Sequence, residues 1–393
     1  MTHCIYLDNH ATTQADPRVV EAMLPYFTEH YGNPGSIGHA FGDTARAAVA
    51  DSRAEMAAAL NVAANEIVFT SGATESNNLA IRGTADRFDV ADAHFISAAT
   101  EHKAVLDPLL RLSRRGYGVT ILDTLPAGND RAGYVEPERV AEAIRDNTRL
   151  VSVMLANNEV GTIQPLREIA AICQERGVLL HCDATQAVGR IPVDIDALGV
   201  DMLSFSGHKI YGPRGIGVLV VRRRRPRIRL LPLIEGGGQE EGRRSGTLNV
   251  PAIVGLAVAL RLCQADLDQE ALRIADLRQR LYDGLVQSLD DVSLNGPAFE
   301  HRLPGNLSMQ FGGVDGEALM MNMDGVAVSS GSACTSANPE PSHVLRGIGM
   351  SEDATRSSLR FGIGRFNTKA DIDAAIDTVC QAVQRLRSLN ASH

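Results

Sequence analysis

The sequence predicts an α/β fold, in which a large, mostly parallel sheet is covered by helices on both faces and a smaller α/β region follows. Two observations support this. From residue 66 onward, short strand patterns alternate with longer helical patterns. Several strand patterns, such as VLLHC at 178–182, are apolar throughout, which is typical of parallel strands buried on both faces. With 393 residues, 44% of them hydrophobic, the chain is long enough for two such regions.

The N-terminal part begins with an extended lead at 1–15 and a predicted helix at 15–30. Asp16 is a suitable N-cap for this helix, and Pro17 suits its first position. A Gly- and Pro-rich loop at 31–39 precedes an Ala-rich helix from about 42 to 60. Strands are then expected at 66–70, 94–99, 118–123, 150–156, 178–182, 201–206 and 217–222. Helices between them are expected at 71–83, 100–116, 137–146 and 165–177.

The C-terminal part mixes both kinds of pattern. Long helical segments are expected over about 252–288, as a link between two domains. Strands are then expected at 293–296, 307–311, 327–330 and 359–364, and helices at 317–323, 341–349 and 369–388. We therefore expect a large domain at 16–262 and a small domain built from 1–15 and 263–393.

Composition narrows the classes of function. The formal net charge of −9 argues against broad nucleic-acid binding, although RRRRPRIR at 222–229 is either a solvated edge or a docking surface for an acidic partner. No stretch has the roughly 20 apolar residues of a membrane span, and the first residues do not resemble a signal peptide, so a cytoplasmic location is expected. The six cysteines include no CxxC pair, so no metal site is expected, although Cys334 could hold a transient cluster.

Polar clusters follow five of the predicted strands. They are SGATES (71–76), TEH (100–102), NNE (157–159), DATQ (183–186) and SGHK (206–209). Because ligands bind beyond the carboxyl ends of the strands in parallel α/β sheets, these clusters are expected to form one site. Each alone would suit a turn or a helix cap.

Pyridoxal phosphate (PLP) is the cofactor that these residue types suit. Lys209 can form a Schiff base with it, and Asp183 can keep the pyridine nitrogen protonated. The helix start at SGATES, with Gly72 and Thr74, can hold the phosphate through backbone N–H groups. The remaining candidates are Ser206 and His208 for the phosphate, His102 to stack on the ring and move a proton, and Asn158 or Gln186 for the ring hydroxyl.

Three further features lie outside the strand ends. The glycine-rich GGGQEEGRRSGT at 236–247 suits either a second phosphate loop or a flexible linker. Arg360 suits either a substrate carboxylate or a solvated strand position. Cys334 lies among small residues in AVSSGSACTSANPEPS (327–342), which favours a reactive thiol on a moving loop over a buried structural cysteine.

Together these motifs resemble a known family. The motifs are YLDNHATT, TSGATESNN, TEHKAV, NNEVGT, DATQAVG, SFSGHKIYGP, RSGT and SSGSACTS. The chain resembles, from about residue 5 to 388, the group I cysteine desulfurases of the IscS/NifS type, which are PLP enzymes of fold type I in the aminotransferase class V family. The resemblance implies a seven-stranded, mostly parallel sheet in the large domain.

The resemblance also implies roles for individual residues. Lys209 would carry the cofactor, Asp183 would pair with its ring nitrogen and His102 would stack on the ring. Asn158 and Arg360 would hold the carboxylate of L-cysteine. Cys334 would accept the sulfur as a persulfide, leaving L-alanine. The other cofactor contacts implied are Ala73, Thr74, Asn158, Gln186, Ser206 and His208, with Thr247 reaching the phosphate of the other subunit of a homodimer.

Some points stay open. Glu241 stands where many relatives carry a basic or small residue, and the loop at 32–39 lacks an arginine often present there. The chain ends at His393, soon after its last predicted helix, where housekeeping relatives carry a longer docking tail. The sulfur acceptor is therefore either an iron–sulfur scaffold protein or an enzyme of DNA or tRNA thio-modification. The alternatives to a desulfurase are a selenocysteine lyase or aminotransferase of the same fold, and a non-catalytic scaffold.

Overall fold

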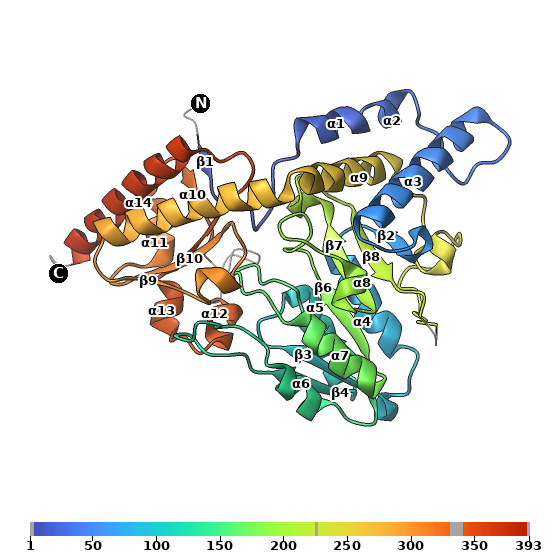
Figure 1. The fold of residues 1–393 in the computed structure, drawn as a ribbon, viewed down its shortest axis with the longest axis horizontal. Helices are drawn as coiled ribbons and strands as arrows, with labels where there is room; N and C mark the ends of the chain where they lie inside the picture. The colour runs from blue at the N-terminus through green and yellow to red at the C-terminus, as the bar shows by residue number, and fades with distance from the viewer. Residues whose placement is uncertain (1–3, 225–226, 331–340, 391–393) are drawn as a thin grey trace.

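The computed structural model describes residues 4–224, 227–330 and 341–390 (Figure 1). Its strands are β1 Ile5–Tyr6, β2 Ile67–Thr70, β3 His94–Ala98, β4 Gly118–Leu122, β5 Thr148–Ser152, β6 Leu179–Asp183, β7 Met202–Ser206, β8 Gly217–Val221, β9 Val292–Leu294, β10 Asn306–Phe311, β11 Val326–Ala327 and β12 Ser358–Gly362. Its α-helices are α1 Pro17–Met23, α2 Pro25–Thr28, α3 Ala40–Ala59, α4 Ala73–Ala85, α5 Lys103–Arg114, α6 Pro137–Ala143, α7 Leu166–Arg176, α8 Ile195–Leu198, α9 Val250–Ala265, α10 Leu267–Ser288, α11 Gly316–Met321, α12 His343–Gly347, α13 Glu352–Arg356 and α14 Lys369–Asn390.

The central sheet has seven strands in the order β2-β8-β7-β6-β5-β3-β4. Four neighbouring pairs are parallel, and β8 is antiparallel to both β2 and β7. The predicted fold, with a mostly parallel seven-stranded sheet, is therefore confirmed. Since every strand except β8 runs the same way, the carboxyl ends of β2, β3, β5, β6 and β7 meet at one edge.

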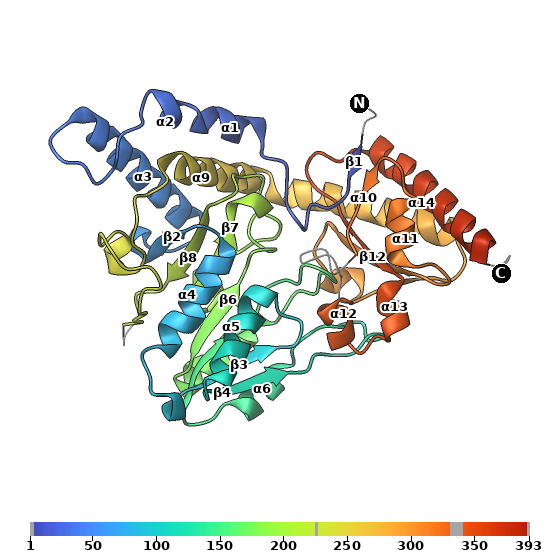
Figure 2. The same ribbon diagram turned by 180° about the vertical axis from the view of Figure 1, so that it is seen from behind.

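Helices cover both faces of this sheet (Figures 1 and 2). One face packs on α4 and α5 through residues such as Leu79 and Leu109. The other packs on α7 and α9 through residues such as Ile169 and Leu256, and α3 lies beside α9 and contacts β2. Strands such as β7 and β8 are buried along their whole length, which explains their continuous apolar patterns.

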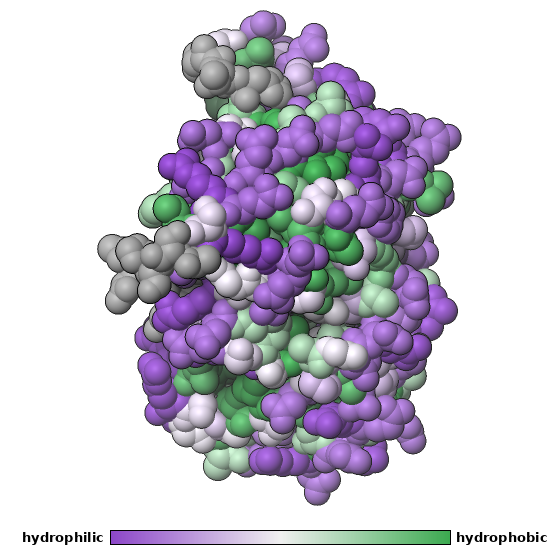
Figure 3. All heavy atoms as spheres, turned by 90° about the vertical axis from the view of Figure 1, so that its left-hand side faces the viewer, coloured by the Kyte–Doolittle hydropathy of each residue, from purple (hydrophilic) through white to green (hydrophobic). Residues whose placement is uncertain are grey.

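A second, smaller core lies around the antiparallel sheet β12-β10-β9. Helices α10 and α14 pack on it, and Ile5 and Leu7 of the N-terminal lead join it beside the parallel pair β1–β11. Figure 3 shows this end of the molecule, where hydrophilic side chains cover most of the surface and apolar ones lie in strips between them. The predicted domain boundary at 262/263 stays a prediction; it falls within α9, and the chain bends by 75° a few residues later, between α9 and α10.

The helix expected at 15–30 is in fact two short helices. Asp16 caps α1, as expected, by accepting the N–H of Arg18 (3.0 Å). Pro25 has no N–H to continue the helical hydrogen bonds, so the chain bends at Leu24 and α2 begins anew.

The basic run at 222–229 is largely paired within the chain. Arg222 contacts Asp196 (2.7 Å) and Arg224 contacts Asp201 (3.2 Å). Arg223 contacts Glu241 (3.0 Å). These contacts favour the interpretation of the run as a charged edge over that of a docking surface.

Within the described part of the chain, no helix taken singly has both the length and the apolar composition of a membrane span. The pair α9 and α10 meets both criteria together, but across the bend of 75°.

Candidate active site

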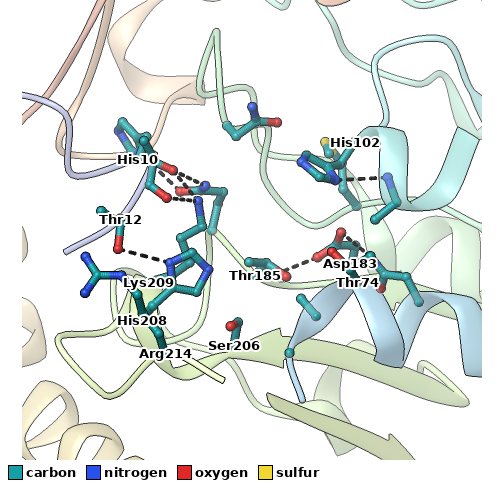
Figure 4. Close-up of a pocket in the computed structure, with 18 of the residues that line it drawn as sticks. His10, Thr12, Thr74, His102, Asp183, Thr185, Ser206, His208, Lys209 and Arg214 are labelled. Atoms are coloured by element: carbon teal, nitrogen blue, oxygen red, sulfur yellow. Dashed lines mark hydrogen bonds between the residues drawn. The ribbon is translucent and has the colours of Figure 1, made fainter. Parts of the chain in front are cut away.

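A cavity of about 500 Å³ opens at the carboxyl edge of the central sheet (Figure 4). It gathers all five polar clusters that follow β2, β3, β5, β6 and β7, together with part of the N-terminal lead and of β12. The predicted site residues that line it are Ala73, Thr74, His102, Asn158, Asp183, Gln186, Ser206, His208, Lys209 and Arg360.

Lys209 ends the short 3₁₀ turn Gly207–Lys209 that follows β7. The backbone packs so closely here that a Cβ on Gly207 would lie 2.7 Å from the Pro213 carbonyl oxygen. Lys209 Nζ donates to the carbonyl oxygens of His10 (2.5 Å) and Ala11 (2.7 Å). The predicted Schiff-base lysine is thus at the cavity wall and not in a solvated turn.

Asp183 is the last residue of β6 and is buried. Its Oδ2 accepts from Asn77 Nδ2 (2.7 Å) and its Oδ1 from the N–H of Thr185 (3.0 Å). These two bonds fix the carboxylate in one orientation, which suits a partner for a ring nitrogen.

His102 caps α5, because its Nδ1 accepts the N–H of Ala104 (3.0 Å). A neutral ring therefore carries its proton on Nε2. Burial lowers the pKa of His102, and the nearby Asp183 partly opposes that shift. The neighbouring Glu101 is buried, and burial raises the pKa of its carboxyl well above the usual range, with the Asp183 charge adding to the effect.

The start of α4 is suited to an anion. Gly72 is its N-cap and no side chain bonds to the free N–H groups of the first turn, so these can face a ligand. Close packing holds this turn in place, because a Cβ on Gly217 would lie 2.5 Å from the Gly72 carbonyl carbon. Ala73 and Thr74 follow at the cavity wall, and His208 Nδ1 lies 3.1 Å from the hydroxyl of Thr12.

Arg360 reaches the cavity from β12 and is buried, so the alternative of a solvated strand arginine is wrong. Its Nη2 pairs with Asp8 (2.8 Å), and its Nη1 donates to the carbonyl oxygen of Asn158 (3.1 Å). Its Nε is buried without a hydrogen-bond partner among the described residues. Arginine and Asn158 therefore meet where the two cores adjoin.

One predicted residue does not line this cavity, and a second lies outside the described part of the chain. Thr247 is exposed, and no residue of the 236–247 loop borders the cavity of its own chain. Cys334 lies outside the described residues. Described residues on either side of it are anchored beside the cavity: Ser329 pairs with the backbone of Arg360, and the hydroxyl of Ser342 donates to Glu159.

Several cavity residues were not predicted individually. His10 and Thr12 come from the lead, Asn77 from α4 and Arg214 from the turn after Lys209. The polar run YLDNHATT was a signal, but sequence patterns do not show that an extended lead folds back against a strand end.

The residues present fit PLP. An amine, a fixed carboxylate and an open helix start line one cavity. Buried polar atoms beside it, Asn77 Oδ1 and Thr185 Oγ1, have no hydrogen-bond partner among the described residues, as expected of a site shaped for a polar ligand.

The fold and site define a class of protein: the chain belongs to the aminotransferase class-V family, whose model matches residues 5–375. This confirms the family predicted from the motifs.

More particular likenesses follow. The chain is 52% identical over 386 residues to the cysteine desulfurase IscS of Anaeromyxobacter dehalogenans (strain 2CP-C), covering 98% of this chain and 94% of that protein. A solved NifS-like protein superposes with a TM-score of 0.89 at 35% identity, covering 97% of this chain and 100% of that one. The crystal structure of DndA from Streptomyces lividans has a TM-score of 0.76 at 42% identity, covering 90% of this chain and 97% of that one.

Proposed function

We propose that this chain is a PLP-dependent cysteine desulfurase, which transfers sulfur from L-cysteine and releases L-alanine. The predicted enzyme class and cofactor are confirmed by the family and by full-length relatives that carry this name at up to 52% identity. The single observation that carries the proposal is the convergence of Lys209, Asp183 and Arg360 on one cavity.

The mechanism assigns a task to each group. PLP, when bound, supplies a covalent link to an amine and a ring that accepts electrons. Lys209 would hold it, Asp183 would face its ring nitrogen, and the α4 start with Ser206 and His208 would hold its phosphate. Arg360, exchanging Asp8 for the substrate carboxylate, would orient L-cysteine together with Asn158.

Bond changes then involve three side chains. Lys209 takes the proton from the substrate Cα. The thiolate of Cys334 attacks the substrate sulfur, so that an S–S bond forms while the C–S bond breaks and its electron pair stays on carbon. Protonation of that carbon, together with return of a proton from Lys209 to Cα, gives alanine and leaves a Cys334 persulfide. His102, neutral in its buried position, is the candidate for moving protons to and from the thiols.

An exposed apolar surface supports the presence of a second copy of the chain, whose cofactor phosphate Thr247 would reach. Exposed apolar side chains gather on α2, the loop after it and the start of α3: Phe27, Tyr31, Ile37 and Phe41 are 59%, 64%, 89% and 49% exposed. A cluster of this kind is typical of an interface between subunits. A homodimer is therefore part of the proposal.

The sulfur acceptor is proposed to be a protein, either an iron–sulfur scaffold or an enzyme of thio-modification, and nucleic acid is not a direct partner. The cytoplasmic location stays a prediction. Capture of persulfide-accepting proteins by the cysteine-loaded enzyme would distinguish the two acceptor classes.

The test is purification with PLP and assay for alanine and sulfide from L-cysteine in the presence of a reductant. Lys209→Ala should lose the absorbance of the bound cofactor–lysine linkage and reduce alanine formation on the order of 10³-fold or more, since the amine both holds the cofactor and moves the proton. A keto-acid product would instead favour an aminotransferase. Turnover of selenocysteine without turnover of cysteine would favour a selenocysteine lyase.

A further inference from the structure

The N-terminal lead forms the wall of the cavity that faces Lys209. Its residues are bonded to the turn that carries this lysine: the N–H of Thr13 donates to the His208 carbonyl oxygen (2.9 Å) and the N–H of Tyr211 donates to Thr13 Oγ1 (2.8 Å). The N–H of Asp16 donates to the carbonyl oxygen of Tyr211 (2.9 Å). These bonds hold Tyr211 at φ 62°, a left-handed conformation that is unfavourable for a non-glycine residue. Such strain is maintained where the chain must take one particular path.

Two carbonyl groups of this wall converge on the amine of Lys209, as Figure 4 shows. Nζ lies 2.5 Å from the oxygen of His10 and 2.7 Å from that of Ala11. We call these two groups the carbonyl cradle. Their partial negative charge favours a protonated amine, since hydrogen bonds from an ionised donor are the stronger ones.

Arg190 bonds to the residues next to the carbonyl cradle and to the backbone of Lys209. Its Nη2 donates to the carbonyl oxygens of Asn9 (2.5 Å) and Lys209 (3.3 Å), and its Nη1 lies 2.8 Å from His10 Nδ1. No carboxylate of the described chain forms an ion pair with Arg190, and burial lowers the pKa of its guanidinium. Because Arg190 bonds both to the lead and to the backbone of Lys209 itself, it acts on geometry rather than on charge pairing.

We propose that the carbonyl cradle receives the Lys209 amine whenever this amine is not bonded to the cofactor, and that Arg190 is the positioning residue that keeps the cradle in reach. The proposal rests on the proposed function, in which Lys209 takes the Cα proton: the C–H bond breaks, its electron pair stays with the substrate, and an N–H bond forms on Nζ. The new ammonium is then held by two fixed oxygens and is kept close to the carbon to which protons return.

The first experiment uses the full-length chain freed of PLP. Urea midpoints are measured for the wild type, Arg190→Met, Lys209→Met and the double variant. The cradle predicts that Arg190→Met lowers the midpoint less in the Lys209→Met background, where there is no ammonium to hold. Repulsion between two cations predicts the opposite sign, because removing Lys209 would then make the loss of Arg190 more costly.

The second experiment uses the PLP-loaded enzyme and follows exchange of the Cα hydrogen of L-alanine in D₂O, a reaction that does not need Cys334. Arg190→Met should lower the exchange rate at saturating alanine on the order of 10- to 100-fold. The alanine concentration that gives half the maximal rate should change by less than about twofold, because a misplaced amine impairs proton transfer and not substrate binding. Arg190→Lys, which keeps a cationic hydrogen-bond donor, should recover most of the rate. Arg278→Met is the matched control, because Arg278 is buried on α10 against Phe299 and does not line the cavity.

Exchange at the wild-type rate in a folded Arg190→Met enzyme would overturn the proposal. It would also be overturned if Arg190→Met lowered the urea midpoint by the same amount, or by more, in the Lys209→Met background. The proposed function fails separately, if the wild type neither exchanges alanine nor releases it from cysteine.

Discussion

At the scale of single residues, burial sets the charge state of the site. The TEH cluster places Glu101 and His102 side by side, and burial acts on both in the direction of the neutral form. Each is also bonded to a backbone N–H: Met154 to Glu101 Oε1 (2.6 Å) and Ala104 to His102 Nδ1 (3.0 Å). Burial therefore favours the neutral form of both side chains near Asp183 and Lys209, although the hydrogen bond from Met154 partly opposes this shift for Glu101.

The proposed role of Cys334 as the sulfur acceptor can also be tested with a single substitution. Cys334→Ser should reduce alanine formation from L-cysteine on the order of 10³-fold or more, because a hydroxyl is a far weaker nucleophile toward sulfur. Cofactor absorbance and Cα exchange of alanine should persist, since they depend on Lys209. Alanine and persulfide formation at the wild-type rate in this variant would show that another group accepts the sulfur.

At the scale of elements, the parallel strands are joined through buried polar side chains as well as through backbone bonds. Ser152 Oγ lies 2.8 Å from His181 Nδ1, and His181 Nε2 lies 2.9 Å from Ser204 Oγ. The chain of contacts crosses β5, β6 and β7 directly below Asp183. It therefore fixes the strands whose ends carry the site.

His181 should make stability depend on pH. Burial lowers its pKa to about 4, against about 6.5 in an unfolded chain. Between these values the unfolded chain binds the proton and the native chain does not, so stability is full above about pH 6.5 and falls as the pH falls toward 4, by on the order of 3 kcal/mol. His181→Gln should flatten the urea midpoint plotted against pH over this window. An unchanged slope would contradict the prediction.

The 236–247 segment is attached to the large core by a buried acid, Glu240, and by the pair of Arg244 with Glu75 on α4 (2.8 Å). Glu240, with a side chain 2% exposed, pairs with Arg53 (2.5 Å) and accepts the N–H of Phe69 (2.8 Å). Arg53 also stacks on the ring of Phe69 (4.4 Å). Glu241, which departs from the family pattern, is 46% exposed and faces Arg223 and Arg243. The two adjacent glutamates therefore differ in burial, which makes them a matched pair.

Glu240→Gln should lower the free energy of unfolding by about 3 kcal/mol, because it leaves Arg53 half-buried without its carboxylate. Glu241→Gln, the control, should cost less than about 1 kcal/mol, since exposed pairs contribute little. Urea unfolding of both variants measures the difference. Equal losses would mean that Glu240 does not anchor the segment.

At the scale of the whole molecule, two cores of unequal size adjoin at the cavity. Arg360 brings the smaller core to the site, while Asp183 and Lys209 belong to the larger one. On the proposed function, a third contribution comes from Thr247 of a second copy, since this residue is exposed and does not line the cavity of its own chain.

The wild type should therefore be a dimer in solution. Phe27→Glu should lower the mass measured by light scattering toward the 42.1 kDa of one chain, because it places a charge in the apolar surface on α2. Leu389→Glu on α14, where the leucine is 54% exposed, should leave the mass unchanged. A wild-type monomer, or a Phe27→Glu dimer as stable as the wild type, would contradict this surface.

The sequence by itself determined the order of the strands and of the longer helices from residue 66 onward, and the polar clusters at five strand ends. These follow from local patterns: continuous apolar runs, helix periodicity, and glycines and caps at turns. It also determined the candidate lysine, carboxylate and arginine, because their residue types match the chemistry of one cofactor.

Only the tertiary structure decided which of these residues meet. The path of residues 8–13 against Lys209, the pairing of Arg360 with Asp8 and the contact of Arg190 with the lead and with Lys209 join segments far apart along the chain. Local periodicity carries no information on such contacts, since they arise from the packing of the two cores. The break at Pro25 and the short helices α8 and α13 escaped prediction for a related reason: a single helical turn is too short to give a periodic signal.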